Sequence, residues 1–346
     1  MGRYRRAILR GGAVIGRMRL LVLGGTRFIG DRIVRAAQRR GDEVTIVHRG
    51  STEPADDPAG DALTGHGTHI HIDRADFAAI SARVRALRPD AVIDTCAMSR
   101  ADADSVLPHL PEVPIILLSS MDVYRAYELL LADEGGQPVP ITEDADVRRG
   151  RYPLRGRIEG HDDYDKLDVE PAYLARGGTA LRLGAIYGER DPQRREEFIL
   201  RRVRAGRKRI PVGAGTWLWT RGYVADVARA VLAALDAPAV AAGQVFNVGE
   251  LATDTMREYA QRILRSAGCD AELVTVPDQD VPADLAMTRS VAQHFLCDSG
   301  KLARTLGWRP AESELSVGRS VRWHLAHPPE SADSDFTPDD RALAGH

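Results

Sequence analysis

The segment Leu20-Leu21-Val22-Leu23-Gly24-Gly25-Thr26-Arg27-Phe28-Ile29-Gly30 joins a short apolar run to a glycine-rich turn. The apolar run predicts a buried strand, and the apolar spacing of residues 28–38 predicts a helix. Backbone N–H groups at a helix start attract an anion, and glycines let a ligand approach the backbone closely. The segment therefore predicts a pyrophosphate site formed by Gly24, Gly25, Thr26, Arg27, Phe28, Ile29 and Gly30. A glycine-rich turn that binds no nucleotide is the alternative.

The composition is that of an ordinary globular protein. The 346 residues carry a formal net charge of −2, so there is no general attraction to nucleic acid or to a membrane. No apolar run approaches the roughly 20 residues that span a bilayer. Cys96, Cys269 and Cys297 lie far apart and lack metal-site spacing, so we expect free thiols, no metal and a reducing, cytoplasmic location. Residues 1–17 and 328–346 are predicted to be loose tails.

Four more short apolar runs follow, and helical patterns lie between them. The runs cover residues 43–47, 69–72, 91–93 and 115–118. Strands that alternate with helices predict an α/β fold with a doubly wound parallel (Rossmann) sheet. Ligands of such a sheet bind beyond the carboxyl ends of its strands. The residues directly after each run are therefore candidates for the site.

Three of these strand ends indicate a dinucleotide. Arg49 follows the second strand, where an acidic residue would hold the ribose 2′-hydroxyl of NAD and an arginine accommodates the 2′-phosphate of NADP. No Asp or Glu is present there, so we predict NADP, with NAD as the alternative. Asp73 and Arg74 follow the third strand, and Asp73 could meet the adenine edge or cap the next helix. Cys96 and Ala97 follow the fourth strand and complete the predicted cofactor contacts.

Six further motifs occur along the chain. They are S-S-M-D-V-Y (119–124), K-L-D-V-E (166–170), L-R-L-G-A-I-Y-G (181–188), Y-V-A-D-V-A (223–228), F-N-V-G (246–249), and D-S-G-K (298–301) with L-G-W-R-P (306–310). In this order they resemble the motifs of extended short-chain dehydrogenase/reductases. Arg27 stands where the glycine turn of that family has its middle glycine. The chain resembles extended members of the NAD-dependent epimerase/dehydratase family, and its altered catalytic pair, described below, resembles the atypical subgroup.

The resemblance implies two lobes. Residues 18–188 and 221–250 would form the dinucleotide-binding domain. Residues 189–220 and 251–327 would form a smaller substrate lobe. Members of the family often pair through two long helices, so the resemblance also implies a homodimer.

The resemblance implies a catalytic Tyr-x-x-x-Lys pair and a serine. Motif alignment gives Ser120 and Lys166, the lysine that lowers the tyrosine pKa and holds the nicotinamide ribose in the family. The tyrosine position holds Asp162, and the nearest tyrosine, Tyr164, lies two residues before Lys166. Residues two apart on a helix point about 200° away from each other. Tyr164 could therefore act only if the helix starts late or bulges there. A late start would have Asp162 or Asp163 as the N-cap.

Three interpretations of the proton-transfer group stay open. Tyr164 acts through a local irregularity, or a carboxylate, Asp162 or Asp122, acts as acid and base after burial moves its pKa toward neutrality. The third interpretation is that no group transfers a proton and the protein binds without turnover.

The substrate lobe is rich in arginine. Arg221 resembles an arginine that contacts a substrate diphosphate in the family, and Asp122, Trp219 and Arg221 are the predicted substrate residues. Trp217 and Trp219 alternate as in a strand and should point to one side. Residues 194–209 carry eight cations: Arg194, Arg195, Arg201, Arg202, Arg204, Arg207, Lys208 and Arg209. They could form a solvated helix face, a phosphate clamp or an RNA-binding patch.

We therefore predict an NAD(P)-dependent epimerase, dehydratase or reductase, that is, an oxidoreductase-type enzyme. Its substrate would be a small, sugar-like molecule, with a nucleotide-linked sugar as one form. The alternative is a dinucleotide-binding regulatory or RNA-associated protein without catalysis. No membrane association is expected.

Overall fold

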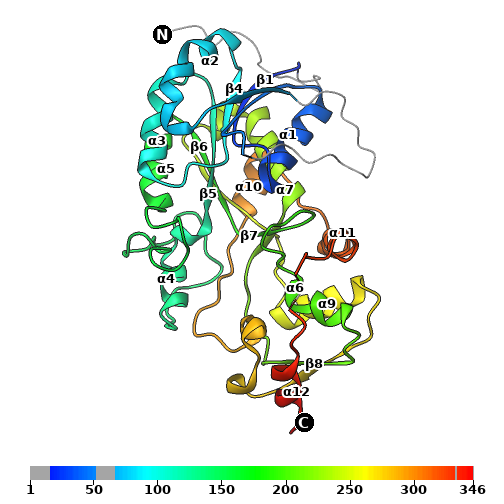
Figure 1. The fold of residues 1–346 in the computed structure, drawn as a ribbon. Coiled ribbons are helices and arrows are strands. Elements are labelled where there is room, and N and C mark those ends of the chain that lie inside the picture. The colour runs from blue at the N-terminus through cyan, green and yellow to red at the C-terminus, as the bar shows by residue number, and fades with distance from the viewer. Residues whose placement is uncertain (1–15, 52–66, 332, 346) are drawn as a thin grey trace.

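A computed structural model describes residues 16–51, 67–331 and 333–345. Its centre is a seven-stranded, fully parallel sheet in the order β10-β6-β5-β4-β1-β2-β3 (Figure 1). The strands are β1 (Arg19–Leu23), β2 (Glu43–His48), β3 (Thr68–His71), β4 (Ala91–Asp94), β5 (Ile115–Ser120), β6 (Thr179–Leu183) and β10 (Val245–Val248). The doubly wound parallel fold predicted from the sequence is thereby confirmed.

Helices cover both faces of this sheet, which is why its strands are apolar on both sides. Leu20 and Val22 of β1 pack into one core, and Leu21 and Leu23 pack into the other. The first core is covered by α1 (Phe28–Arg40), α7 (Val224–Asp236) and α10 (Gly300–Leu306). The second is covered by η1 (Arg74–Ile80), α2 (Ser81–Leu87), α3 (Arg100–Val106) and α5 (Lys166–Leu174).

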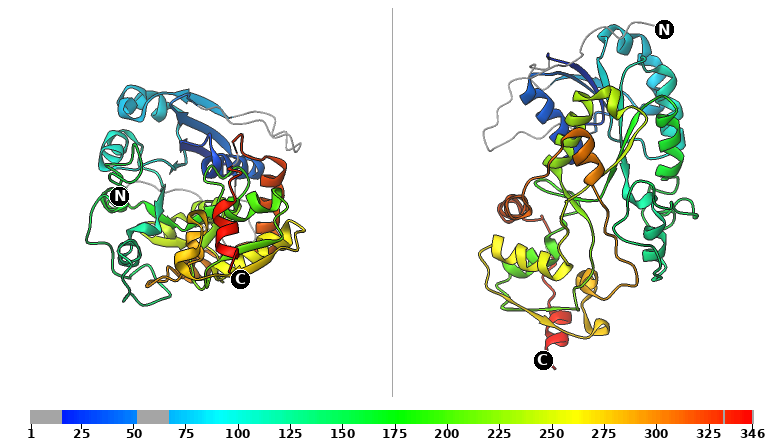
Figure 2. Two further views of the ribbon diagram at one scale, coloured as in Figure 1. Left: turned by 60° about the horizontal axis from the view of Figure 1, so that its bottom comes forward. Right: turned by 180° about the vertical axis from the view of Figure 1, so that it is seen from behind.

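A second group of elements lies beyond the carboxyl end of β6, at the lower end of the molecule (Figures 1 and 2). Two small parallel sheets belong to it: β7 (Ala185–Tyr187) with β9 (Arg221–Tyr223), and β8 (Arg209–Val212) with β11 (Glu272–Thr275). Its helices are α6 (Glu197–Arg204), α9 (Met256–Ser266), α11 (Ser313–Ala326) and α12 (Thr337–Leu343). The remaining elements are η2 (Leu107–His109), η3 (Met121–Val123), α4 (Arg125–Leu131), α8 (Pro238–Ala241), η4 (Asp278–Asp280) and η5 (Ala283–Thr288).

The prediction of a loose C-terminal tail was wrong for its last helix. Asp339 of α12 is fully buried and forms a two-pronged ion pair with Arg202 of α6, at 2.7 and 2.8 Å. Because both charges are shielded from water, this pair ties α12 to the second lobe. The expectation of a loose N-terminal tail concerns residues 1–17, of which only Gly16 and Arg17 are among the described residues. Of the helices described, none combines the length and the apolar character needed to cross a membrane.

Candidate active site

The glycine turn is shaped by close backbone packing. Gly24 and Gly25 have φ angles of +91° and +99°, which disfavour any side chain. A Cβ at Gly24 would lie 2.2 Å from Thr95 Oγ1, and a Cβ at Gly30 would lie 2.7 Å from the Cα of Gly25. Within the described chain, no side chain caps the start of α1, where exposed Arg27 is the N-cap. This cradle, with its N–H groups at a helix start, fits a pyrophosphate.

The predicted residues after β2 and β3 differ in their contacts. Arg49 is exposed just beyond β2. The Asp73 side chain accepts a hydrogen bond from Ala75 N and caps η1. Of the two predicted roles of Asp73, the structure therefore shows the helix cap. Arg74 turns inward and pairs with the buried carboxylate of Asp94 at 2.5 Å. The Arg74 guanidinium therefore binds the carboxylate at the end of β4, and its predicted contact with the cofactor stays a prediction.

The residues after β4 border the glycine turn. Cys96 Sγ lies 3.5 Å from the Cβ position built on Gly24. Burial raises the pKa of the Cys96 thiol to about 12, which keeps it protonated. The carbonyl oxygen of Ala97 accepts a hydrogen bond from Lys166 Nζ at 2.6 Å. Cys96 and Ala97 therefore connect the cradle to the predicted catalytic lysine.

The helix that carries Lys166 starts later than its motif suggests. α5 begins at Lys166 itself, and its N-cap is Asp165, which accepts from Leu167 N. The prediction of Asp162 or Asp163 as the cap was wrong. Buried Arg148 holds the cap, since its Nη2 lies 2.8 Å from Asp165 Oδ1. Tyr164 therefore precedes the helix, and the helical phase that would turn it away from Lys166 does not apply.

Tyr164 and Asp122 form one unit. The Tyr164 hydroxyl donates to Asp122 Oδ2 at 2.6 Å, and Asp122 N donates to Ser120 Oγ at 3.2 Å. Lys166 Nζ donates to the carbonyl oxygens of Ala97 and Leu118. The end of β5 and the start of α5 thus bring Ser120, Asp122, Tyr164 and Lys166 together.

The pKa values of this cluster are shifted by burial and by mutual charges. Burial and the carboxylate of Asp122 raise the pKa of Tyr164 well above its usual range. Burial also raises the pKa of Asp122, although the Tyr164 hydroxyl opposes this change. The pKa of Lys166 is lowered by burial, against the opposing charge of Asp122. A tyrosine in this setting keeps its proton and acts as a donor toward Asp122.

Asp162, the other carboxylate considered from the sequence, lies outside this cluster. It is exposed, and its Oδ1 accepts from Gly156 N at 2.9 Å. It serves a loop and does not face Tyr164 or Lys166 in the described contacts. The interpretation of Asp162 as the acid/base group is therefore wrong.

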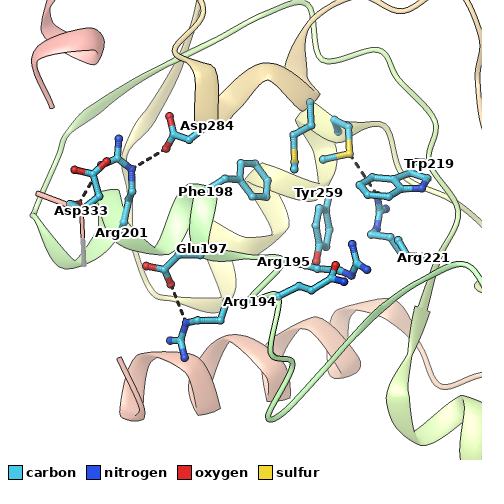
Figure 3. Close-up of a pocket in the computed structure, with 14 residues that line it drawn as sticks. Arg194, Arg195, Glu197, Phe198, Arg201, Trp219, Arg221, Tyr259, Asp284 and Asp333 are labelled. Atoms are coloured by element: carbon cyan, nitrogen blue, oxygen red, sulfur yellow. Dashed lines mark hydrogen bonds and ion pairs between the residues drawn. The ribbon is translucent and has the colours of Figure 1, made fainter. Parts of the chain in front are cut away.

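A cavity of about 410 Å³ opens in the second lobe and is lined by Arg195, Trp219, Arg221 and Tyr259 among others (Figure 3). Trp217 and Trp219 stack with ring centroids 4.8 Å apart, so they point to one side as predicted. The Arg221 guanidinium lies 3.9 Å from the centre of the Tyr259 ring. None of the lining residues belongs to the Tyr164 cluster, so cavity and cluster are separate parts of the candidate site.

Two buried polar atoms in the cavity wall indicate a polar ligand. Arg221 Nε and the Tyr259 hydroxyl have no hydrogen-bond partner among the residues that the structure describes. Leaving such atoms unpaired is costly, so each is a candidate for a hydrogen bond to a bound ligand. Tyr259 was not predicted, because it lies in α9, far from Arg221 in the sequence. Arg195 was part of the arginine run, but its place in the cavity wall could not be read from spacing.

The eight cations of residues 194–209 are all paired. Each has a carboxylate oxygen within 4.0 Å. Arg201 and Arg202 are buried and share Asp284. The run is therefore neither a fully solvated face nor an open basic patch. Three of its members, Arg194, Arg195 and Arg201, line the cavity.

Comparison with known proteins identifies a matching family and two relatives that differ in their named activities. The sequence model of the NAD dependent epimerase/dehydratase family matches residues 20–109 and 169–249. The chain is 27% identical to the chloroplast stem-loop binding protein of 41 kDa b from Arabidopsis thaliana, over 94% of this chain and 84% of that protein. It is 28% identical to the 2′-dehydrokanamycin reductase of Streptomyces kanamyceticus, over 75% of this chain and 70% of the reductase.

Among solved structures, the fold is similar to that of the UDP-glucose-4-epimerase from Stenotrophomonas maltophila, crystallised with NAD and formylated UDP-arabinopyranose. The TM-score is 0.66 at 18% identity, over 90% of this chain and 98% of the epimerase. At this identity the likeness concerns the fold alone.

Proposed function

We propose that this chain, whose sequence matches the model of the NAD dependent epimerase/dehydratase family over residues 20–109 and 169–249, binds a nicotinamide dinucleotide. We further propose that it transfers a proton through Tyr164 and Asp122 during oxidation or reduction of a sugar-like substrate. The observation that carries the proposal is the 2.6 Å hydrogen bond from the Tyr164 hydroxyl to Asp122. It replaces the family's tyrosine–lysine geometry with a tyrosine–carboxylate pair. We place the reaction among the epimerases, dehydratases and reductases of this family.

The dinucleotide, when bound, supplies the exchange of hydride with the substrate. The cradle of Gly24, Gly25 and Gly30 would hold its pyrophosphate. Exposed Arg49 would accept a 2′-phosphate, which favours NADP over NAD. Two of the three N–H donors of Lys166 go to carbonyl oxygens in the described contacts, and the third would serve the nicotinamide ribose.

Tyr164 would relay a proton between the substrate oxygen and Asp122. Its raised pKa makes a lasting phenolate unfavourable, so a proton that it takes from a substrate hydroxyl is passed on to the carboxylate. The raised pKa of Asp122 favours acceptance of that proton. Ser120, which holds the Asp122 backbone, would also polarise the substrate oxygen. In the reduction direction, the same atoms return the proton.

The cavity suits an anionic, partly planar substrate group. Arg195 and Arg221 supply positive charge, and Trp219 offers an aromatic face. Guanidinium groups match phosphate oxygens in geometry. We therefore propose a nucleotide-linked or phosphorylated sugar. Following the resemblance to a family that pairs through two helices, we also propose a homodimer through α3 and α5.

The test begins with the cofactor. Freshly purified protein is denatured, and the released dinucleotide is identified by chromatography and mass spectrometry. Bound NAD would indicate internal recycling of hydride, and empty protein that takes up NADPH would indicate a reductase. Binding of neither would contradict the proposal.

Variants then test the proton relay. Turnover is followed by dinucleotide absorbance with a panel of keto-sugars and nucleotide-linked sugars. Tyr164→Phe and Asp122→Asn should lower kcat by about 10²–10⁴-fold and leave NADPH affinity unchanged. Asp162→Asn, a carboxylate outside the cluster, should behave as the wild type. Undiminished turnover in Tyr164→Phe would refute the relay, and no turnover on any substrate by a dinucleotide-loaded protein would favour the non-catalytic alternative.

We do not extend stem-loop binding to this chain. An RNA-binding surface needs accessible cations along the backbone path. The run at residues 194–209 has its charges paired with carboxylates. No described feature favours nucleic acid over a small molecule.

A further inference from the structure

Three histidines gather on one face of two neighbouring strands. His48 ends β2, and His69 and His71 lie on β3. Side chains two apart on a strand point to the same face, and the strand register pairs His48 with His71. The His48 ring centroid is 4.9 Å from that of His69 and 4.6 Å from that of His71. Strand alternation and register therefore assemble the trio.

The nitrogen atoms are close enough to share a ligand. One candidate ligand atom from each histidine lies within 4.8 Å of the other two. His48 Nε2 and His69 Nδ1 are 2.8 Å apart and share one proton. Two nitrogens bound to one zinc ion at its usual bond length are about 3.3 Å apart. The spacing of these two nitrogens is therefore already close to that of two zinc ligands, and a nitrogen of exposed His71 lies within the same group.

We propose that His48, His69 and His71 bind one divalent transition-metal cation, of which Zn²⁺ is the representative. Neutral imidazole suits zinc, copper and nickel, whereas magnesium and calcium prefer oxygen ligands. A tetrahedral zinc site with three imidazole ligands takes one further ligand, such as water. The spacing His69-Ile70-His71 is the sequence signal for this site, and the cysteine-based reasoning overlooked it.

One local rearrangement accompanies binding. Gly50 N donates to His48 Nδ1 at 3.2 Å. When Nε2 binds the metal, Nδ1 carries the ring proton, so the Gly50 amide must turn away. Gly50 has a φ of +77°, and glycine tolerates such backbone changes. The Gly50 amide is therefore a specific reporter of metal at His48.

The site is separate from the proton-transfer cluster. β2 lies three positions from β5 in the sheet order, which corresponds to about 14 Å at the usual strand spacing. The cation would add positive charge near Arg49 and would take no part in proton transfer at Tyr164. Its binding can be tested without a substrate.

The experiment uses the full chain without a polyhistidine tag, stripped with a chelator and titrated with ZnCl₂ in a calorimeter. We expect one zinc per chain, release of protons to the buffer, and no comparable binding of MgCl₂. His69→Gln and His71→Gln should each weaken zinc binding at least tenfold, and His109→Gln, in η2, should not. In an amide NMR spectrum, zinc should shift Gly50 in the wild type.

Two results would overturn the site. One is zinc uptake well below one per chain, and the other is uptake that His69→Gln and His71→Gln leave unchanged, which would place any metal elsewhere. Melting curves without metal show whether each variant is folded. Because His71 is exposed, His71→Gln should melt as the wild type without zinc and should lose the zinc-dependent rise in Tm.

Discussion

Replacement of Glu196 by Gln should remove a pH-dependent loss of stability. Glu196 is fully buried at the N-cap of α6. Its Oε1 accepts from Ser320 Oγ at 2.6 Å, and its Oε2 lies 3.8 Å from His324 Nε2. Burial raises the pKa of Glu196 from 4.5 to about 7. The folded protein therefore keeps a proton that the unfolded chain releases.

Proton linkage gives the direction and size of the change in stability that Glu196 causes. Between pH 4.5 and 7 the folded state binds more protons than the unfolded state, so stability falls as the pH rises. The whole pKa difference corresponds to about 3 kcal/mol, of which about 2.5 kcal/mol is lost between pH 5 and 8. Gln is uncharged at every pH and still accepts from Ser320. The stability advantage of Glu196→Gln should therefore grow by about 2.5 kcal/mol across this range.

The assay is urea unfolding at several pH values from 5 to 8 for the wild type and the variant. The difference in free energy of unfolding between the variant and the wild type, taken at each pH, cancels the contributions of other titrating groups. Glu134→Gln, at an exposed position, is the matched control and should show a constant difference. A constant difference for Glu196→Gln as well would show that Glu196 ionises normally, and the reasoning would fail.

Three further predictions concern stability and the cradle. Burial lowers the pKa of His324 to about 4, so the neutral ring stabilises the folded state above pH 6.5 and this stabilisation is lost in acid. In the same urea series, the free energy of unfolding of the wild type should fall by about 2 kcal/mol between pH 7 and 5 relative to His324→Gln. Asp339→Ala leaves Arg202 without one of its buried partners and should lower the free energy of unfolding by about 3 kcal/mol, which denaturant melts would detect. Gly24→Ala forces a Cβ against Thr95 Oγ1 and should cost more than about 1 kcal/mol and abolish NADPH binding in a fluorescence titration; normal binding would contradict the cradle.

The Tyr164 cluster shows where sequence reasoning reaches its limit. The motif alignment predicted Ser120 and Lys166, and the structure places both near Tyr164. The alignment could not decide between Tyr164 and Asp122 as the proton-transfer group, because these two residues are 42 positions apart in the sequence. The structure turns these two alternatives into one hydrogen-bonded pair.

The sequence by itself determined the parallel fold class, five of the seven strands of the sheet and the position of the glycine turn. Apolar runs of strand length, glycines at a strand end and a helical pattern act over fewer than 20 residues, and local spacing encodes them fully. Even the identity of Arg49 at the end of β2 could be read directly. Boundaries shifted by only one or two residues, as in β2, which extends to His48.

The tertiary structure alone decided which charges meet. Arg148 fixes the start of α5 through Asp165, and Arg202 holds α12 through Asp339, a residue 137 positions away. A buried ion pair depends on two side chains that share a dry environment, and no pattern within either segment encodes its partner. For the same reason, the sequence could not show that Arg201 and Arg202 are the buried members of the arginine run, where both pair with Asp284.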